Sequence, residues 1–372
     1  MKEKYDFYNI PNNYGLEDYK DAVDYIVKRY CKLEGLISIY IWGGQFTPGI
    51  SDLDIVFVFE NGKIPAMPFS KRIFYMMNKK YRYIARHPFF YIDKISFKNI
   101  RNIYPDAEFK LLYGENIKIN KLSERNAHFS RIALMCDIIT RHYPRDFLEQ
   151  EIAKSINARD MLLRLNSLRH SLKSMELIKK EKNKRLAEKL NHIELLRKNW
   201  FKSNNFDLLA SLNKDAIKIS MDIAENLKNF LIDNNLVKIH TVNNIEYNGA
   251  RNNTLFIKNW DKEISLNDMS GLIRNNKKFF SILPIEFAPQ LIEYSRYKGP
   301  ISSFIRDRLK GDLKYEIKYS SIIKKKAMIL NKQAELALKL RHSDFVAFFD
   351  FGYRNKPGIN NFLLNIARGL RD

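Results

Sequence analysis

The segment Ile37–Glu60 constrains the fold of this chain more than any other stretch of the sequence. It begins with a β-branched and aromatic run that ends at Trp42 and is long enough for one strand. Gly43-Gly44 interrupt this run, and Thr47-Pro48-Gly49 has the composition of a tight turn. The continuous apolar run Ile55–Phe59 is typical of a strand that is buried on both faces. The segment therefore predicts two strands joined by a short loop.

Two aspartates, Asp52 and Asp54, stand at the start of the second strand. Because side chains alternate along a strand, both carboxylates are expected on the same side, with Leu53 on the other. Two adjacent carboxylates repel each other unless a cation lies between them. Mg²⁺ binds in this way, through one or two carboxylates together with the oxygens of a substrate phosphate. The Gly43-Gly44 turn would let a phosphate approach the backbone amides, so the segment indicates a site for a metal-bound nucleoside triphosphate.

This arrangement of Gly43-Gly44, a short loop and Ser51-Asp52-Leu53-Asp54 resembles the signature of the DNA polymerase beta-like nucleotidyltransferase superfamily. In that pattern Gly-Gly or Gly-Ser is followed by a loop and by Asp-x-Asp or Asp-x-Glu between apolar residues. The second glycine replaces the commoner serine, and the loop is short. The resemblance covers only the first third of the chain. It implies a two-metal site in which Asp52 and Asp54 hold Mg²⁺ against the triphosphate, while a later strand supplies a third carboxylate.

We expect this third carboxylate to be Asp93, which interrupts an otherwise apolar strand pattern over Phe89–Phe97. A carboxylate in the middle of a strand is costly to bury without a partner, and a metal shared with the two earlier aspartates would supply one. An ion pair with Lys94, or simple exposure to solvent on an edge strand, is the alternative. Two further acidic residues remain as candidates: Asp106 and Glu108. Among the nucleotide-binding positions Gly43, Gly44 and Ser51, the serine is expected to shape the turn rather than to contact the substrate.

The rest of the pattern predicts an α+β protein with three parts. A nucleotidyltransferase domain with a small mixed sheet would occupy residues 1–120, beginning with a helix over Leu16–Lys32 and ending with a short helix that closes on Gly114. Apolar residues at helical spacing predict a helical bundle over residues 121–235. Residues 236–372 change period, which indicates a small β hairpin followed by helices, the last of them over Gly358–Leu370.

The net charge of the 372-residue chain is +22, which is typical of a protein that binds RNA, another polyanion or a membrane surface. The alternative is a compositional bias toward lysine, although such a bias would also raise the number of glutamates. Basic side chains on the outer faces of the predicted bundle would either be solvated or line a groove for a polyanion. These residues are Arg164, Arg169, Lys173, Lys189, Arg197 and Lys198.

The remaining composition excludes several classes of protein. The two cysteines, Cys31 and Cys136, have neither metal-ligand spacing nor a disulfide pattern, which favours a reducing compartment. The N-terminus lacks an apolar signal core, and no window is long enough for a membrane span, so we expect a cytoplasmic protein. The histidines show no zinc spacing, and the sequence contains neither a Walker loop nor a Gly-x-Ser-x-Gly elbow.

The resemblance thus implies a Mg²⁺-dependent, NTP-binding (for example ATP-binding) nucleotidyltransferase that moves a nucleoside monophosphate to a hydroxyl acceptor and releases pyrophosphate. Its site would contain Asp52, Asp54 and Asp93. An RNA 3′ end is an acceptor that would account for the net charge. A small molecule, as in antibiotic-modifying members of the superfamily, and a protein hydroxyl are the other acceptors. A non-catalytic nucleic-acid-binding module that retains the fold is the alternative from outside the enzymes.

Overall fold

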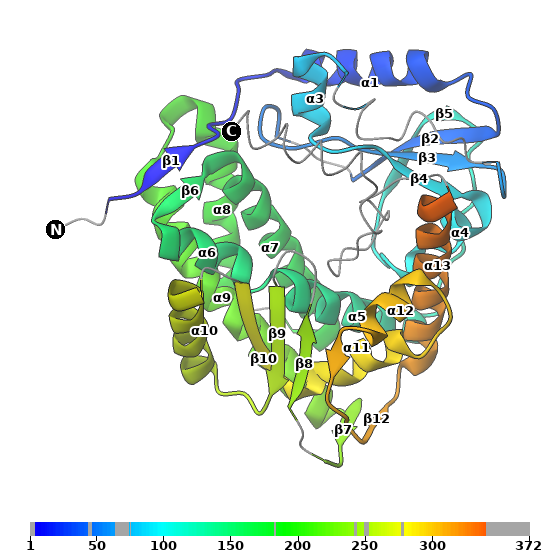
Figure 1. Cartoon of the computed structure of the whole chain (residues 1–372). Coiled ribbons are helices and arrows are strands. Elements are labelled where there is room, and N and C mark those ends of the chain that lie inside the picture. The colour runs from blue at the N-terminus through cyan, green and yellow to red at the C-terminus, as the bar shows by residue number, and fades with distance from the viewer. Residues whose placement is uncertain are drawn as a thin grey trace.

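The strands around the two aspartates belong to a four-stranded mixed sheet of order β4-β3-β2-β5 (Figure 1). β2 (Leu36–Trp42) runs antiparallel to both β3 (Asp54–Phe59) and β5 (Phe109–Gly114), whereas β3 runs parallel to β4 (Phe90–Asp93). The computed structural model describes residues 4–43, 47–63, 74, 76–181, 184–241, 244–248, 253–276 and 279–339. Within these residues the fold is α+β, as predicted.

Both faces of this sheet are covered, which explains the uninterrupted apolar run of β3. Ile55, Phe57 and Phe59 pack with α1 (Leu16–Tyr30) and α3 (Lys79–Ala85) in one hydrophobic cluster. Val56 and Val58 point to the other face and join the cluster that contains α4 (Lys94–Lys98), the 3₁₀ helix η1 (Ile100–Asn102) and the helical region. The two-faced burial predicted for this strand is therefore present.

Two local predictions are wrong in this sheet. The segment before Gly114 is not a helix, because Phe109–Gly114 pairs with β2 and becomes the edge strand β5. The strand predicted over Phe89–Phe97 ends at Asp93, because the carboxylate of Asp93 accepts a hydrogen bond from the Ser96 amide and so begins helix α4. In the first case strand pairing overrides local helix preference, and in the second a cap ends the strand.

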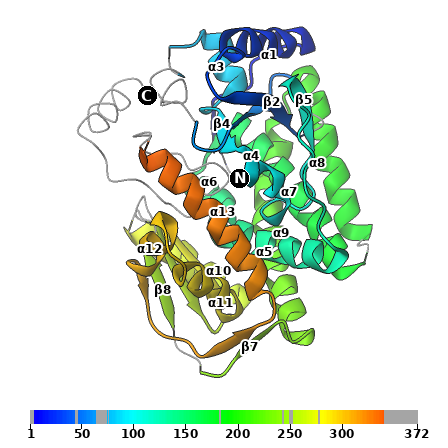
Figure 2. The same cartoon turned by 90° about the vertical axis from the view of Figure 1, so that its right-hand side faces the viewer.

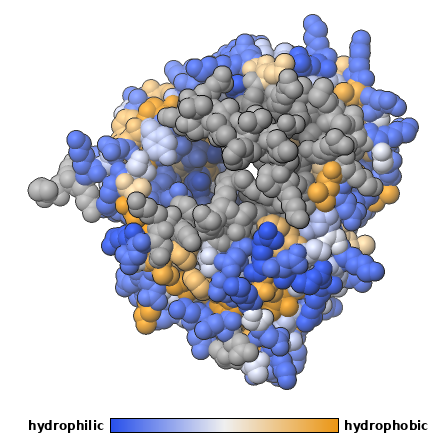
Figure 3. Space-filling view, in the orientation of Figure 1, coloured by the Kyte–Doolittle hydropathy of each residue, from blue (hydrophilic) through white to orange (hydrophobic). Residues whose placement is uncertain are grey.

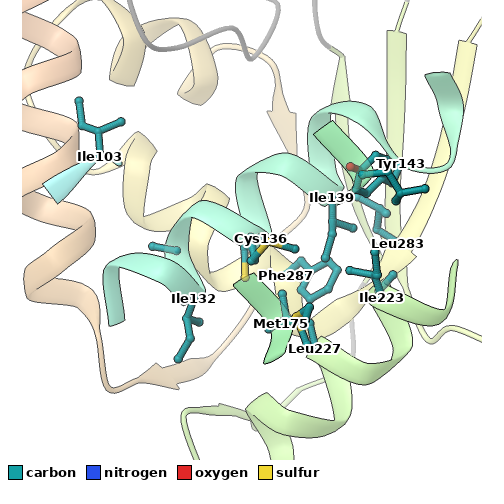
Figure 4. Close-up of a cluster of buried hydrophobic side chains, with 14 of the residues drawn as sticks. Ile103, Ile132, Cys136, Ile139, Tyr143, Met175, Ile223, Leu227, Leu283 and Phe287 are labelled. Carbon is teal, nitrogen blue, oxygen red and sulfur yellow. The ribbon is translucent and has the colours of Figure 1, made fainter. Parts of the chain in front are cut away.

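The predicted helical bundle is present as five consecutive helices with one large shared core. They are α5 (Glu124–His142), α6 (Arg145–Ala153), α7 (Ala158–Lys179), α8 (Lys184–Ser203) and α9 (Phe206–Asp233). Figure 4 shows Ile139 of α5, Ile223 of α9 and Phe287 among the side chains that gather in this core. Near the N-terminus, β1 (Asp6–Tyr8) pairs in parallel with β6 (Ser155–Asn157), which attaches the start of the chain to the helical region.

The C-terminal part combines two small sheets with further helices. A β hairpin is present, but β8 (Ile245–Asn248) and β9 (Asn253–Lys258) form it. The strand predicted from Val237 onward is β7 (Val237–Ile239), which pairs with β12 (Tyr315–Ile317) and not with β9. The sheet with the hairpin also contains β10 (Phe279–Pro284) and β11 (Leu309–Lys310). The helices are α10 (Lys262–Asn276), η2 (Ile285–Phe287), α11 (Ala288–Ser295), α12 (Pro300–Arg306) and α13 (Ser320–Lys339).

Helix α13 connects the end of the described chain back to the first sheet. It lies beside α4 in Figure 1 and crosses the molecule diagonally in Figure 2. Apolar residues from Tyr40 to Ala337 belong to one hydrophobic cluster, and the division of the chain into three domains stays a prediction. The helix predicted over Gly358–Leu370 lies outside the described residues. No helix in the described part of the chain is long and apolar enough to span a membrane.

Candidate metal centre

Asp52, Asp54 and His87 meet at one edge of the mixed sheet. Asp52 precedes β3, Asp54 is the first residue of β3, and His87 lies just before β4. Because β3 and β4 are parallel and Val56 is paired with Phe90, the starts of both strands lie side by side. One ligand atom from each of the three side chains lies within 4.8 Å of the other two, and all three side chains are partly exposed. Two carboxylate oxygens and one imidazole nitrogen thus form a cluster that can hold a metal ion.

His87 is the member of this cluster that the sequence analysis missed. The pair His87-Pro88 is typical of the end of a helix, and α3 does end just before it, at Ala85 with Arg86 as its C-cap. Arg86 has a positive φ of 61°, which reverses the chain and brings His87 back toward β3. The imidazole Nε2 lies 2.9 Å from the Asp54 Oδ1, and its ring packs edge-on against Phe90. The sequence shows a histidine just before an apolar strand. That histidine is recognised as a candidate ligand only once β4 is known to pair with β3.

The prediction that Asp93 is the third ligand is wrong. Asp93 is paired with Phe59 at the far end of β3, which places it roughly 16 Å along the strand from Asp54. Its carboxylate accepts hydrogen bonds from the Ser96 amide and hydroxyl at 3.0 and 2.7 Å, and forms an ion pair with Lys332 of α13 at 2.9 Å. Burial opposes its ionisation, but these partners together lower the pKa of Asp93. Asp93 therefore has a structural partner in place of a metal.

The alternative partners and ligands considered for this position are also accounted for. Lys94 forms its ion pair with Glu115 and not with Asp93. Asp106 binds Arg131 through a two-point ion pair, with both N–O distances at 2.7 Å. Neither Asp106 nor Glu108 belongs to the cluster of metal-ligating groups.

The three residues predicted to bind the nucleotide, Gly43, Gly44 and Ser51, differ in their surroundings. Gly44 lies outside the described residues. The Gly43 amide donates a hydrogen bond to the carbonyl of Glu108 at 2.9 Å, which continues the pairing of β2 with β5 and leaves this amide engaged within the protein. Gly43 has a φ of 95°, so a side chain would be strained there although it would meet no neighbouring atom. The Ser51 hydroxyl accepts a hydrogen bond from the Thr47 amide at 2.9 Å, as expected of a residue that shapes the turn.

The turn before Asp52 is fixed by aromatic side chains from two helices. The Tyr19 hydroxyl of α1 donates to the Ser51 carbonyl at 2.5 Å and accepts from the Gly49 amide at 3.0 Å. The Tyr83 hydroxyl of α3 donates to the Gly49 carbonyl at 2.7 Å. Gly49 has a φ of 76°, and a Cβ here would lie 2.3 Å from the Asn12 carbonyl oxygen. Only glycine fits this position, and the turn presents Asp52 in a defined orientation.

The two carboxylates of the cluster repel each other, and a bound cation would reduce this repulsion. Burial raises the pKa of Asp54, and repulsion from Asp52 adds to the effect, while the hydrogen bond with His87 opposes it. Burial lowers the pKa of His87, but the carboxylates outweigh this effect and the net shift is upward. Arg86 adds a guanidinium whose Nη1 lies 3.6 Å from the Asp52 Oδ2 and whose Nη2 lies 2.5 Å from the Asp160 Oδ1. A proton or a metal ion would satisfy the Asp54–His87 pair.

Hydrophilic side chains predominate on the described surface that faces the viewer in Figure 3. Most of the basic residues expected to line a groove are committed to other contacts. Arg164 pairs with Asp146, while Arg169 and Lys198 both pair with Glu194. Arg197 is buried, and Lys173 is exposed. Binding of a polyanion by this region stays a prediction.

Comparisons with known proteins add no relative to this picture, because no protein-family model, curated protein or solved structure matches the chain.

Proposed function

We propose that the chain is a metal-dependent nucleotidyltransferase that resembles the DNA polymerase beta-like superfamily in its N-terminal part. The observation that carries this proposal is the meeting of Asp52, Asp54 and His87 at one edge of a mixed sheet. The two aspartates follow a glycine turn and begin a strand that is covered on both faces. Such an arrangement presents carboxylates to a substrate while the rest of the strand anchors them in the core.

The donor set fits a divalent cation. Carboxylate oxygens suit Mg²⁺ and Mn²⁺, and an imidazole nitrogen favours Mn²⁺ and other transition metals over Mg²⁺. The three side chains are only partly exposed, so a bound ion would keep some coordination positions for phosphate oxygens or water. In the superfamily a third carboxylate from a later strand usually completes the site, whereas the third member of this cluster is His87. We therefore extend the expected metal from Mg²⁺ to Mg²⁺ or Mn²⁺.

The proposed reaction is an in-line displacement at phosphorus. The acceptor hydroxyl gives its proton to water, and its oxygen forms a bond to the α-phosphorus of the NTP. The bond from that phosphorus to the bridging oxygen of the β-phosphate breaks, and pyrophosphate leaves with the electron pair. A bound divalent cation would neutralise phosphate charge and acidify the attacking hydroxyl. Asp52, Asp54 and His87 would hold it, and the Arg86 guanidinium at the edge of the cluster would contact phosphate oxygens.

The test is transfer of label from α-³²P-NTPs in the presence of Mg²⁺ or Mn²⁺ to pools of RNA, protein and small molecules. We expect label in one pool together with released pyrophosphate, and we expect RNA to be that pool because of the net charge of +22. Asp52→Asn and Asp54→Asn should abolish transfer. Asp106→Asn is the matched control, since this aspartate of the same domain pairs with Arg131 outside the cluster. Transfer that survives in Asp52→Asn, or that is absent from the wild type with every pool, would contradict the proposal.

A further inference from the structure

Two buried arginines from the helical region reach into the turn that precedes Asp52. They are Arg159 of α7 and Arg197 of α8, and each is only 4% exposed. The Arg159 Nε donates to the Ile50 carbonyl at 3.1 Å, and its Nη2 lies 3.4 Å from the Ser51 carbonyl. The Arg197 Nη2 donates to the Ser51 hydroxyl at 3.0 Å. Two separate helices thus hold the two residues that immediately precede Asp52.

The same guanidinium groups also tie this turn to its neighbours. The Arg159 Nη1 donates to the Tyr83 carbonyl at 2.8 Å, and its guanidinium carbon lies 3.6 Å from the centroid of the Tyr83 ring. Tyr83 belongs to α3, the helix that leads into Arg86 and His87. The Arg197 Nη1 donates to the Leu162 carbonyl of α7 at 2.5 Å. Arg159 therefore connects the segment that carries Asp52 with the segment that carries His87.

Neither arginine forms an ion pair with a described carboxylate, although burial of a charged group without one is costly. Burial and the nearby Arg169 lower the pKa of Arg197 to about 10, and Asp52 is the carboxylate that opposes this effect. Burial also lowers the pKa of Arg159, and Asp52 again opposes this shift. Arginine is suited to such a position because its rigid fork can bind several acceptors at once, which lysine cannot.

We infer that Arg159 and Arg197 are positioning residues of the metal centre, which fix Asp52 relative to His87. They do not touch the cluster itself, and their positive charge by itself would weaken cation binding. Their contribution is therefore geometric: they hold the backbone on which the ligands stand. It follows that the helical region supports the metal centre from outside the cluster, in addition to being a candidate for acceptor binding. This inference rests on the metal centre of the proposed function but not on the reaction.

The test compares Mn²⁺ affinity among folded variants of the full chain, measured by the electron paramagnetic resonance signal of free Mn²⁺. Arg197→Lys keeps the charge, but one ammonium group cannot bridge the Leu162 carbonyl and the Ser51 hydroxyl as the guanidinium does. We expect its dissociation constant to rise about tenfold, the lower end of the range for lost outer-shell partners of metal ligands. Arg169→Lys is the matched control: this α7 arginine pairs with Glu194, and its replacement should leave the affinity unchanged.

Ser51→Ala provides a second variant that leaves both arginines in place and removes only the hydroxyl that binds Arg197 and the Thr47 amide. It should weaken Mn²⁺ binding in the same direction while circular dichroism shows a folded protein. Wild-type affinity in Arg197→Lys and Ser51→Ala would overturn the positioning role and leave the metal centre intact. Tighter binding in Arg197→Met would mean that the arginine acts only through its charge. Absence of Mn²⁺ binding by the wild type would overturn both this inference and the proposed function.

Discussion

Replacement of Asp93 distinguishes a structural carboxylate from a metal ligand in this sheet. Alanine at this position removes the N-cap of α4, which costs about 1 kcal/mol. It also breaks the ion pair with Lys332. Removing one partner of a fully buried pair costs about 3–5 kcal/mol, but Lys332 is 42% exposed and can return to water, so only a fraction of this applies. We expect Asp93→Ala to lower the free energy of unfolding by about 2–4 kcal/mol.

Asp93→Asn refines the estimate because asparagine is an equally good cap. It retains an oxygen for the Ser96 amide, but it replaces the oxygen that accepts from the Ser96 hydroxyl with an NH2 group and removes the charge beside Lys332, so we expect a loss of about 1–2 kcal/mol. The pKa of Asp93 is lowered in the folded state, and this determines how its contribution to stability changes with pH. Its contribution is complete above the unfolded pKa of about 3.9 and disappears as the pH falls through the lower folded value. Asp93→Asn should therefore be less sensitive to acid than the wild type.

The assay pairs urea unfolding with Mn²⁺ titration of the same preparations. Asp93→Asn should lose stability and keep wild-type Mn²⁺ affinity. Asp54→Asn should lose Mn²⁺ binding and keep or gain stability, because it removes a negative charge that Asp52 repels. The structural reasoning would be refuted by the opposite pattern, in which Asp93→Asn abolishes Mn²⁺ binding and leaves the unfolding curve unchanged.

Three further measurements test the charges that the structure brings together. Arg86→Met should raise the KM for the NTP and weaken inhibition by pyrophosphate about tenfold, since a charge-assisted contact to phosphate is worth about 1.5–3 kcal/mol; an unchanged KM would contradict a phosphate contact. Lys326 is 1% exposed and pairs with Asp137, so Lys326→Met should destabilise the protein by about 3–5 kcal/mol in urea unfolding, and adding Asp137→Asn should restore part of the loss. Mn²⁺ affinity should fall as the pH is lowered from about 7, because the pKa values of Asp54 and His87 are both raised and protons compete with the metal. A Mn²⁺ affinity that does not change with pH would exclude these two residues as ligands.

Much of the mixed sheet follows from local patterns in the sequence. The run Ile55–Phe59 predicts a strand with two covered faces, and α1 and the helical region cover them. The helix predicted before Gly114 fails because its residues complete the open side of β2, and only the tertiary pairing determines that choice. Asp93 carries a second, overlooked signal: aspartate followed three residues later by Ser96, whose amide and hydroxyl both donate to it, is a helix start. Because aspartate is a preferred N-cap residue, the sequence also allowed Asp93 to begin a helix instead of binding a metal.

The candidate site also combines residues that the local sequence predicts with residues that only the fold brings together. Alternation along one strand places Asp52 and Asp54 together, and this needs no knowledge of the fold. His87 joins them only through the register between β3 and β4, and that register depends on the packing of whole helices against the sheet. Arg159 lies still further away in sequence, yet it holds the carbonyls next to Asp52 from the first turn of α7. A site of this kind is therefore encoded in two parts: a short motif specifies the charged ligands, and distant helices specify the angle at which those ligands meet.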